Sequence, residues 1–245
     1  MDPLTSMAAS GLRSNLESLD LIANNLANVQ TSGFKADSEF YSLYASSEAE
    51  SPAPGDLPQM PVIQRNWTDF SQGDLHQTGI PTDLAISGAG FFTVVGPNGP
   101  LYTRNGAFQF TPTGHLVNSE GYPLLGFDGK PIQLDPTQTL DIMPDGTLRQ
   151  NGAVTGRIQP VTFKTMSDLS KQGASLSRFN GPDESITAAQ GLVLQGRLEG
   201  SNVEVAGSVV RMVTVQRQFE MLQKSILINV DMNTAAIQQV AKSGA

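Results

Sequence analysis

The sequence predicts an α+β fold. The N- and C-terminal helices are expected to form a coiled-coil-like domain, and the residues between them in the sequence to form a central all-β domain. Apolar residues recur at helical spacing near both termini, whereas residues 67–198 show short apolar runs separated by turn dipeptides. A single helix cannot bury an apolar stripe without a second surface, so both ends need partners. The predicted divisions are an N-terminal helix (1–35), an extended connector (36–66), the central β-domain (67–198) and a C-terminal helix (199–245).

The N-terminal helix is expected to begin between Pro3 and Thr5 and to end near Ala27, before the Ser32-Gly33 pair. Glycine after a helix is the usual left-handed terminator. The apolar stripe steps 3-4-3-4-3 through Ala9, Leu12, Leu16, Leu19, Ala23 and Leu26. This spacing keeps the stripe on one side of the helix.

Asparagines crowd the end of this helix at Asn24, Asn25 and Asn28. Asparagine is a poor helix former, so its presence there needs an explanation. Two remain open: C-capping with surface exposure, or hydrogen bonding across subunits.

The connector contains a proline-rich and acidic stretch at residues 45–65, with Pro52, Pro54, Pro58 and Pro61. This composition excludes a helix and packs poorly as sheet. We therefore expect an extended or mobile connection.

The central region shows the alternation of short apolar runs and turn residues that is typical of an antiparallel β-fold. Short apolar or alternating runs occupy 84–86, 91–95, 107–110 and 192–194. The turn dipeptides between such runs are Asn98-Gly99, Asn105-Gly106, Asp128-Gly129, Asp145-Gly146 and Asn151-Gly152. Such pairs accept positive φ angles and favour tight hairpins. The pattern predicts a barrel-like or sandwich-like domain in which Phe91 and Phe92 face opposite sides of a strand.

The C-terminal helix is expected to start after Ser201 or Asn202, either of which can act as its N-cap, and to run to about Ala241. Its stripe steps 4-3-4-3 through Ser208, Met212, Val215, Phe219, Leu222, Ile226, Asn229, Asn233, Ala236 and Val240. Polar residues near the seam act either as register devices or as defects of an imperfect amphipathic helix. The predicted self-assembly seams are Leu12, Leu16, Leu19, Leu26, Met212, Val215, Phe219, Leu222 and Ile226.

Composition excludes several classes of function. The net charge of −8 argues against a nucleic-acid groove, and the absence of cysteine removes thiolate metal sites and cysteine nucleophiles. The two histidines, His76 and His115, lack carboxylates at metal-ligand spacing. We therefore predict no catalytic, metal or cofactor site, no small-molecule substrate and no enzyme. Neither a signal peptide nor an apolar run long enough to span a membrane is recognisable.

Several motifs resemble those of the bacterial flagellar rod and hook proteins. The N-terminal run 24–35 contains Asn24, Asn25, Leu26, Ala27, Asn28, Gly33 and Phe34. The C-terminal runs 198–203 and 216–220 contain Ser201, Asn202, Val203, Gln216 and Arg217. Between them, 73–79, 83–86, 90–92, 102–106 and 121–126 are similar to the entry of the family's central β-domain. These runs occur in the family's order and together cover most of the chain.

The resemblance implies an axial protein of the flagellar basal body. Its terminal helices would form an inner coiled-coil layer of the periplasmic rod, and its β-domain an outer layer. Its partners would be further copies of itself, neighbouring rod and basal-body axial proteins, and the flagellar type III export apparatus, which needs no cleaved signal peptide. The run 217–221 resembles the proximal-rod members more than the distal-rod members, which are the alternative.

A different class competes with this interpretation: a soluble β-domain binding module, or a glycan-acting enzyme, with a helical oligomerisation stalk. It requires ordered ends in a closed oligomer and, for the enzyme, a convergent pair of acidic residues. The sequence offers no such pair.

Overall fold

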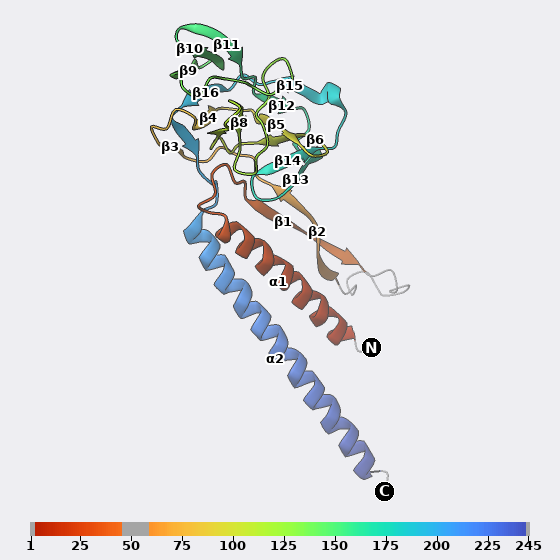
Figure 1. The fold of residues 1–245 in the computed structure, drawn as a ribbon. Helices are drawn as coiled ribbons and strands as arrows, with labels where there is room; N and C mark the ends of the chain where they lie inside the picture. The colour runs from red at the N-terminus through yellow and green to blue at the C-terminus, as the bar shows by residue number, and fades with distance from the viewer. Residues whose placement is uncertain (1–2, 46–58, 244–245) are drawn as a thin grey trace. The chain divides into compact units, whose positions relative to one another are not determined.

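The computed structural model describes residues 3–45 and 59–243, with side chains left out at 3–7, 40–45, 59–66, 233, 236–237 and 239–243. The chain divides into two units (Figure 1). We call Met1–Ala27, Asp37–Thr68 and Glu204–Ala245 the terminal unit, and Asn28–Ala36 and Asp69–Val203 the central unit.

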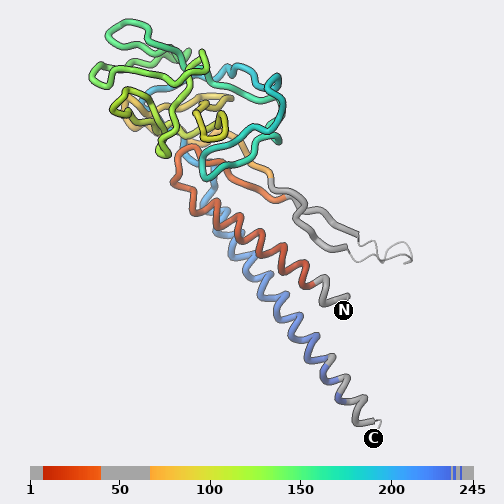
Figure 2. The backbone as a smooth tube through the Cα atoms, turned by 45° about the vertical axis from the view of Figure 1, so that its right-hand side comes forward, coloured from red at the N-terminus to blue at the C-terminus, as the bar shows by residue number. Residues whose placement is uncertain are grey.

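The terminal unit contains two helices and one β-hairpin. Helix α1 (Pro3–Ala27) and helix α2 (Val205–Ser243) lie side by side and run in opposite directions, as Figures 1 and 2 show. Strands β1 (Asp37–Ala45) and β2 (Gln59–Thr68) pair antiparallel, with a register shift between Phe40 and Tyr41. Both strands contact α1. Helix α1 begins within the expected range of Pro3 to Thr5 and ends at the expected Ala27. No helix in the described ranges is both long and apolar enough to cross a bilayer.

The hairpin differs from the expected connector. Residues 59–65 belong to β2, although their prolines argued against a sheet. Pro61 is tolerated because a two-stranded sheet leaves each strand one edge that needs no hydrogen-bond partner. The rest of the proline-rich stretch, 46–58, lies outside the described residues.

The central unit is built from short strands. They are β3 (Leu75–Gln77), β4 (Leu84–Ser87), β5 (Phe92–Gly96), β6 (Gly99–Thr103), β7 (Gln109–Phe110), β8 (Leu116–Val117), β9 (Leu140–Ile142), β10 (Thr147–Gln150), β11 (Ala153–Arg157), β12 (Val161–Phe163), β13 (Leu169–Lys171), β14 (Leu176–Phe179), β15 (Ile186–Ala188), β16 (Leu192–Gln195) and β17 (Arg197–Glu199). Two 3₁₀ turns, η1 (Met166–Asp168) and η2 (Asp183–Ser185), lie among them.

These strands form small antiparallel sheets, of which the largest has the order β13-β14-β6-β5. Within the described ranges no sheet closes into a barrel, so the barrel expectation is wrong, whereas the antiparallel all-β character is confirmed. The turn chemistry explains the local shape. At the β10–β11 turn, Asn151 and Gly152 have φ angles of 48° and 80°, and Gln150 pairs with Ala153. This is the geometry of a two-residue hairpin.

Two apolar clusters fill the central unit. The larger joins Leu84, Ile86, Phe92, Phe108, Leu116, Leu148 and other fully buried residues. The smaller contains Phe91, Tyr102, Phe163 and Leu169. Adjacent Phe91 and Phe92 enter different clusters because successive strand residues point to opposite faces. Phe91 therefore lies in a second core within the chain.

Candidate functional site

The apolar seam of α2 faces α1 within the same chain. Its partly or fully buried positions are Ser208, Met212, Val215, Phe219, Leu222, Ile226 and Asn229, and every other described position of α2 is exposed. These seven residues keep the 4-3 spacing of the sequence stripe. Gly11 of α1 allows the close approach, because a Cβ there would lie 3.2 Å from a methyl carbon of Leu222.

The α1 stripe lies differently. Leu12, Leu19 and Leu26 are only half-buried, and Leu16 is 49% exposed. Among the side chains of α1 that the structure describes, the buried ones are Ser14, Ser18, Ile22 and Asn25. Helix α1 contacts the β1–β2 hairpin as well as α2, so its covered surface is not centred on its apolar residues.

A second apolar face of α2 is not covered by any described part of the chain. Val210, Met221, Ile228 and Met232 are between 60% and 67% exposed. At 100° per residue they lie about 100–140° around the helix from Val215, all on the same flank of the covered seam. We call these four residues the outward face.

A buried carboxylate connects three elements of the terminal unit. The side chain of Glu39 on β1 is only 2% exposed. It accepts a hydrogen bond from the Ser18 hydroxyl of α1 and pairs with Arg211 of α2, with 2.8 Å between Arg211 Nη2 and Glu39 Oε1. This carboxylate therefore ties α1, β1 and α2 together.

The contacts of Asn25 explain one of the asparagines at the end of α1. Its Nδ2 donates to the Asp37 carbonyl at 2.8 Å, and its Oδ1 accepts from the Asp37 amide at 3.0 Å. It therefore joins α1 to the start of β1 within one chain, which neither sequence explanation included.

A second buried carboxylate, Glu199, organises the central unit. It is fully buried and pairs with Lys35 and with Arg104, with 3.0 Å between Arg104 Nη1 and Glu199 Oε2. The Gly73 amide donates to Glu199 Oε1 at 3.0 Å, and Lys35 Nζ also donates to the Ser71 carbonyl at 2.6 Å. Buried charges are tolerated where they are paired and hydrogen-bonded in this way.

The two cations of this cluster differ in their surroundings. Burial lowers the pKa of the Lys35 ammonium below its usual 10.5, and the attraction of Glu199 opposes that effect. Arg104 donates through Nη2 to the Gly88 carbonyl at 2.9 Å, and its Cζ lies 5.2 Å from the centre of the Phe91 ring. Its buried Nε has no hydrogen-bond partner in the described part of the chain.

The segment before Lys35 is inserted into the central unit. The Gly33 amide donates to the Glu199 carbonyl at 2.7 Å, and the ring of Phe34 is buried. Gly33 has a φ angle of 69°, and a Cβ there would lie 2.2 Å from the Asn105 nitrogen. Both facts require glycine at this position.

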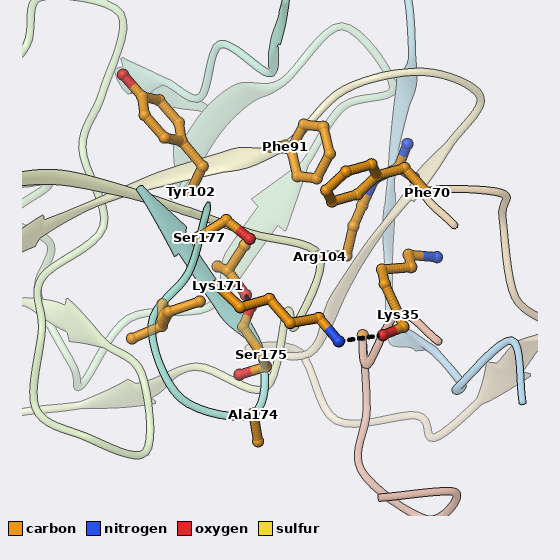
Figure 3. A pocket seen from close by; sticks show the side chains of 12 residues that line it. Lys35, Phe70, Phe91, Tyr102, Arg104, Lys171, Ala174, Ser175 and Ser177 are labelled. Carbon is orange, nitrogen blue, oxygen red and sulfur yellow. Dashed lines mark hydrogen bonds between the residues drawn. The ribbon is translucent and has the colours of Figure 1, made fainter. Parts of the chain in front are cut away.

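A narrow pocket borders this segment (Figure 3). Lys35, Arg104 and Lys171 contribute its charged lining, with Ser175 and Ser177 beside them. Lys171 Nζ donates to the Lys35 carbonyl at 2.5 Å, drawn as the dashed line in Figure 3, and lies 4.3 Å from the centre of the Phe34 ring. No aspartate, glutamate or histidine is among the described residues that line the pocket.

Asn202 connects chain segments rather than capping α2, which begins three residues later at Val205. Its Oδ1 accepts from the Ala36 amide at 2.8 Å, and its Nδ2 donates to the Asp69 carbonyl at 2.8 Å. The expected capping role of Asn202 is therefore wrong. Ser201 Oγ accepts from the Val203 amide at 3.2 Å, so it too acts before the helix begins.

The quoted motif residues thus separate into two groups. Gly33, Phe34, Ser201, Asn202 and Val203 lie in the central unit, close to Glu199 in sequence or in space, as the bonds above show. Half-buried Asn28 also belongs to the central unit. In the terminal unit, Gln216 and Arg217 are exposed on α2. On α1, Asn24 and Ala27 are exposed, Leu26 is half-buried and Asn25 is buried.

Sequence reasoning missed the buried charges Glu39, Lys35, Arg104 and Glu199. One signal of the Lys35–Glu199 pair was present in the sequence. Only 16% of the residues are charged, yet Lys35 and Glu199 each lie within two residues of a motif glycine.

Three models of flagellar protein families match the N-terminal, central and C-terminal segments of the chain. Residues 85–155 match the model of the flagellar hook protein FlgE/F/G D1 domain. Residues 194–239 match that of the flagellar basal body rod FlgEFG protein C-terminal region, and residues 6–35 match that of the flagella basal body rod protein.

Individual relatives match over nearly their whole length. The flagellar basal-body rod protein FlgF of Caulobacter vibrioides is 34% identical over 91% of this chain and 92% of its own length. FlgG of Buchnera aphidicola subsp. Schizaphis graminum is 32% identical over 92% of this chain and 95% of its own length. FlgF of Mesorhizobium japonicum is 32% identical over 82% of this chain and 83% of its own length. The chain therefore belongs to the family of flagellar basal-body rod proteins, a structural rather than enzymatic family.

Proposed function

We propose that this structural rod subunit self-assembles through its terminal helices into the axial drive shaft of the flagellar basal body. The observation that carries the proposal is the outward face of α2. A helix with two apolar faces, one of which already packs on α1, requires a second neighbour to remove the other face from water.

The two faces have different roles in this proposal. The seam residues, with Phe219 and Leu222 at their centre, hold α2 against α1 and so shape the subunit. The outward face and exposed Leu16 then meet neighbouring copies. Burial of each large apolar side chain contributes about 1.5–3 kcal/mol. A head-to-tail contact that does not close into a ring generates a helical tube, which is the geometry of a rod.

Within the rod we propose the proximal position, on the basis of Arg217-Gln218-Phe219-Glu220-Met221. The distal rod is the alternative, because the names of the FlgF and FlgG relatives give no position within the rod. Cryo-electron microscopy of basal bodies carrying a labelled chain would separate them. Label in the segment nearest the inner membrane supports the proximal position, and label next to the hook overturns it.

We also propose export through the flagellar apparatus to the periplasmic rod without cleavage of a signal peptide. Mass spectrometry of the chain recovered from isolated basal bodies tests this directly. Recovery of the N-terminal peptide that begins at Met1 or Asp2 supports it. A shortened N-terminus at a single site would contradict it.

Two substitutions test the assembly surfaces separately. Phe219→Asp places a charge in the seam, so we expect loss of α1–α2 packing and of assembly without unfolding of the central unit. Met221→Asp changes only the outward face, so the monomer should keep its helix content but fail to form rods.

Val154→Asp is the matched control, because Val154 is an exposed valine of the central unit, at 63% exposure. Rod formation is scored by electron microscopy of basal bodies, and monomer folding by circular dichroism. Normal rods with Met221→Asp would show that the outward face is not an assembly surface.

A further inference from the structure

The chain enters or leaves the central unit at four points, and three of them meet at one side chain. The crossings follow residues 27, 36, 68 and 203. Ala36 and Asp69 flank two of them, and Asn202 lies just before the fourth. The amide of Asn202 bonds to both of the other two segments.

The bonds form a closed set. Asn202 Oδ1 accepts from the Ala36 amide at 2.8 Å, and Asn202 Nδ2 donates to the Asp69 carbonyl at 2.8 Å. The Asp69 amide in turn donates to the Ala36 carbonyl at 2.8 Å. Asn202 Nδ2 also lies 3.1 Å from Ser71 Oγ. Because asparagine carries a donor and an acceptor on one planar group, it can hold two backbones at once.

The buried Glu199 cluster lies next to these bonds in the sequence and connects the same chain segments. Glu199, three residues before Asn202, is fixed by Lys35 next to Ala36 and by the Gly73 amide. The Gly33 amide and the Glu199 carbonyl add a backbone bond between the same two segments. The segments next to these crossings are therefore connected both by the buried Glu199 ion pairs and by the hydrogen bonds of Asn202.

We infer that Asn202 is a positioning residue for force transmission, which binds together three of the four places where load on the terminal helices enters the central unit. The inference rests on the proposed function as a rod subunit. A shaft turns as one body only if its inner and outer parts turn together. A segment end that nothing binds has free φ and ψ rotations, whereas the ends at Ala36, Asp69 and Asn202, bound to one another, move as a group.

The test compares Asn202→Ala with Asn118→Ala in the full chain, in the bacterium that carries this gene. Asn118 is a matched control, because it is a buried asparagine of the central unit whose Oδ1 accepts from the Tyr122 amide at 2.8 Å and the Glu120 amide at 3.1 Å. It bonds to none of the crossings through these contacts. Both variants lose side-chain hydrogen bonds, but only one releases the crossing segments.

Hydrogen exchange on the purified chain checks that the change is local. We expect the Ala36 amide to exchange roughly tenfold faster in Asn202→Ala, the factor that corresponds to about 1.4 kcal/mol, and to be unchanged in Asn118→Ala. Equal protection of Ala36 in both variants would overturn the inference at this step.

Swimming speed is then measured at increasing medium viscosity, which raises the load on the shaft. We expect both variants to assemble and swim at low viscosity, and only Asn202→Ala to lose speed steeply, or to shed broken basal bodies, at high viscosity. Equal speed curves for the two variants overturn the inference.

Asn202→Asp guards against a general folding defect, because it keeps the acceptor for Ala36 and loses the donor to Asp69. An intermediate viscosity dependence supports the inference. Failure of both Asn202 variants to assemble at low load overturns it, because assembly does not depend on the crossing bonds in this account. If the unaltered chain is absent from isolated basal bodies, the proposed function itself has failed, which is a separate result.

Discussion

Lys35 and Glu199 are 164 residues apart in the sequence, yet they form an ion pair that is almost completely removed from solvent. Lys35 ends the segment that follows α1, and Glu199 precedes α2 by a few residues. The pair therefore joins the two ends of the central unit. Arg104 at the end of β6 shares the same carboxylate, so the β-structure is included in the connection.

Glu199→Gln is expected to destabilise the central unit by about 3–5 kcal/mol, because it leaves two buried cations without their counter-charge. The free energy of unfolding, measured by urea denaturation of the full chain, tests this. Glu17→Gln is the control, since Glu17 pairs with Arg13 on the surface of α1, with side chains 45% and 84% exposed. That change should cost no more than about 0.5 kcal/mol. Similar costs for both would show that Glu199 does not organise the unit.

Lys35 is expected to titrate below pH 10.5, because burial outweighs the attraction of Glu199 and lowers its pKa. Between the folded pKa and 10.5, the unfolded chain binds more protons at this site than the folded chain does. The contribution of Lys35 to the free energy of unfolding therefore rises with pH across that window. The Cε chemical shift of Lys35, followed by NMR during a pH titration, measures the folded pKa. A value at or above 10.5 contradicts the prediction.

Gly33→Ala should cost several kcal/mol more than Gly79→Ala. Both glycines have φ angles near 70°, at 69° and 72°, so both substitutions carry the same left-handed penalty of about 1–2 kcal/mol. A Cβ at Gly33 meets the Asn105 nitrogen at 2.2 Å, whereas one at Gly79 meets nothing within 4 Å. The difference in melting temperature between the two variants isolates the close approach. Equal melting temperatures would mean that residues 33–35 are not inserted as described.

Val215→Ala should weaken the terminal unit more than Val213→Ala does. The two valines are two residues apart on α2, but Val215 is 6% exposed and Val213 44%. Each change removes two methyl groups, which is about 1.5 kcal/mol when they are fully buried. Thermal loss of the circular dichroism signal at 222 nm reports helix unfolding. A larger effect at Val213 would place the seam on another side of α2.

The regular parts of the fold could be predicted because their signals are local. The 4-3 spacing from Ser208 to Asn229 marks the covered positions of α2, since helical geometry alone decides which residues share a side. Asn151-Gly152 marks its hairpin because the required φ angles are a property of two residues.

Features that depend on distant segments could not be predicted. Asn202 has the chemistry of a helix cap, and only the arrival of Ala36 and Asp69 makes it a bridge instead. Likewise, Glu39 lies in the expected connector, and its burial depends on Ser18 of α1 and Arg211 of α2, which are distant in the sequence. The side of α1 that is covered within the chain could not be predicted for the same reason, because the hairpin also packs on that helix.

The placement of Glu199 also sets an order of events in biosynthesis. A ribosome makes Lys35 early and Glu199 late, so the nascent central unit carries Lys35, and later Arg104 as well, without their shared counter-charge until residue 199 has been made. Neither the Asn202 bridge nor β17 can form until that last stretch has emerged. Completion of this unit is therefore a post-translational or very late co-translational step, and any chain that ends before residue 199 lacks the means to finish it.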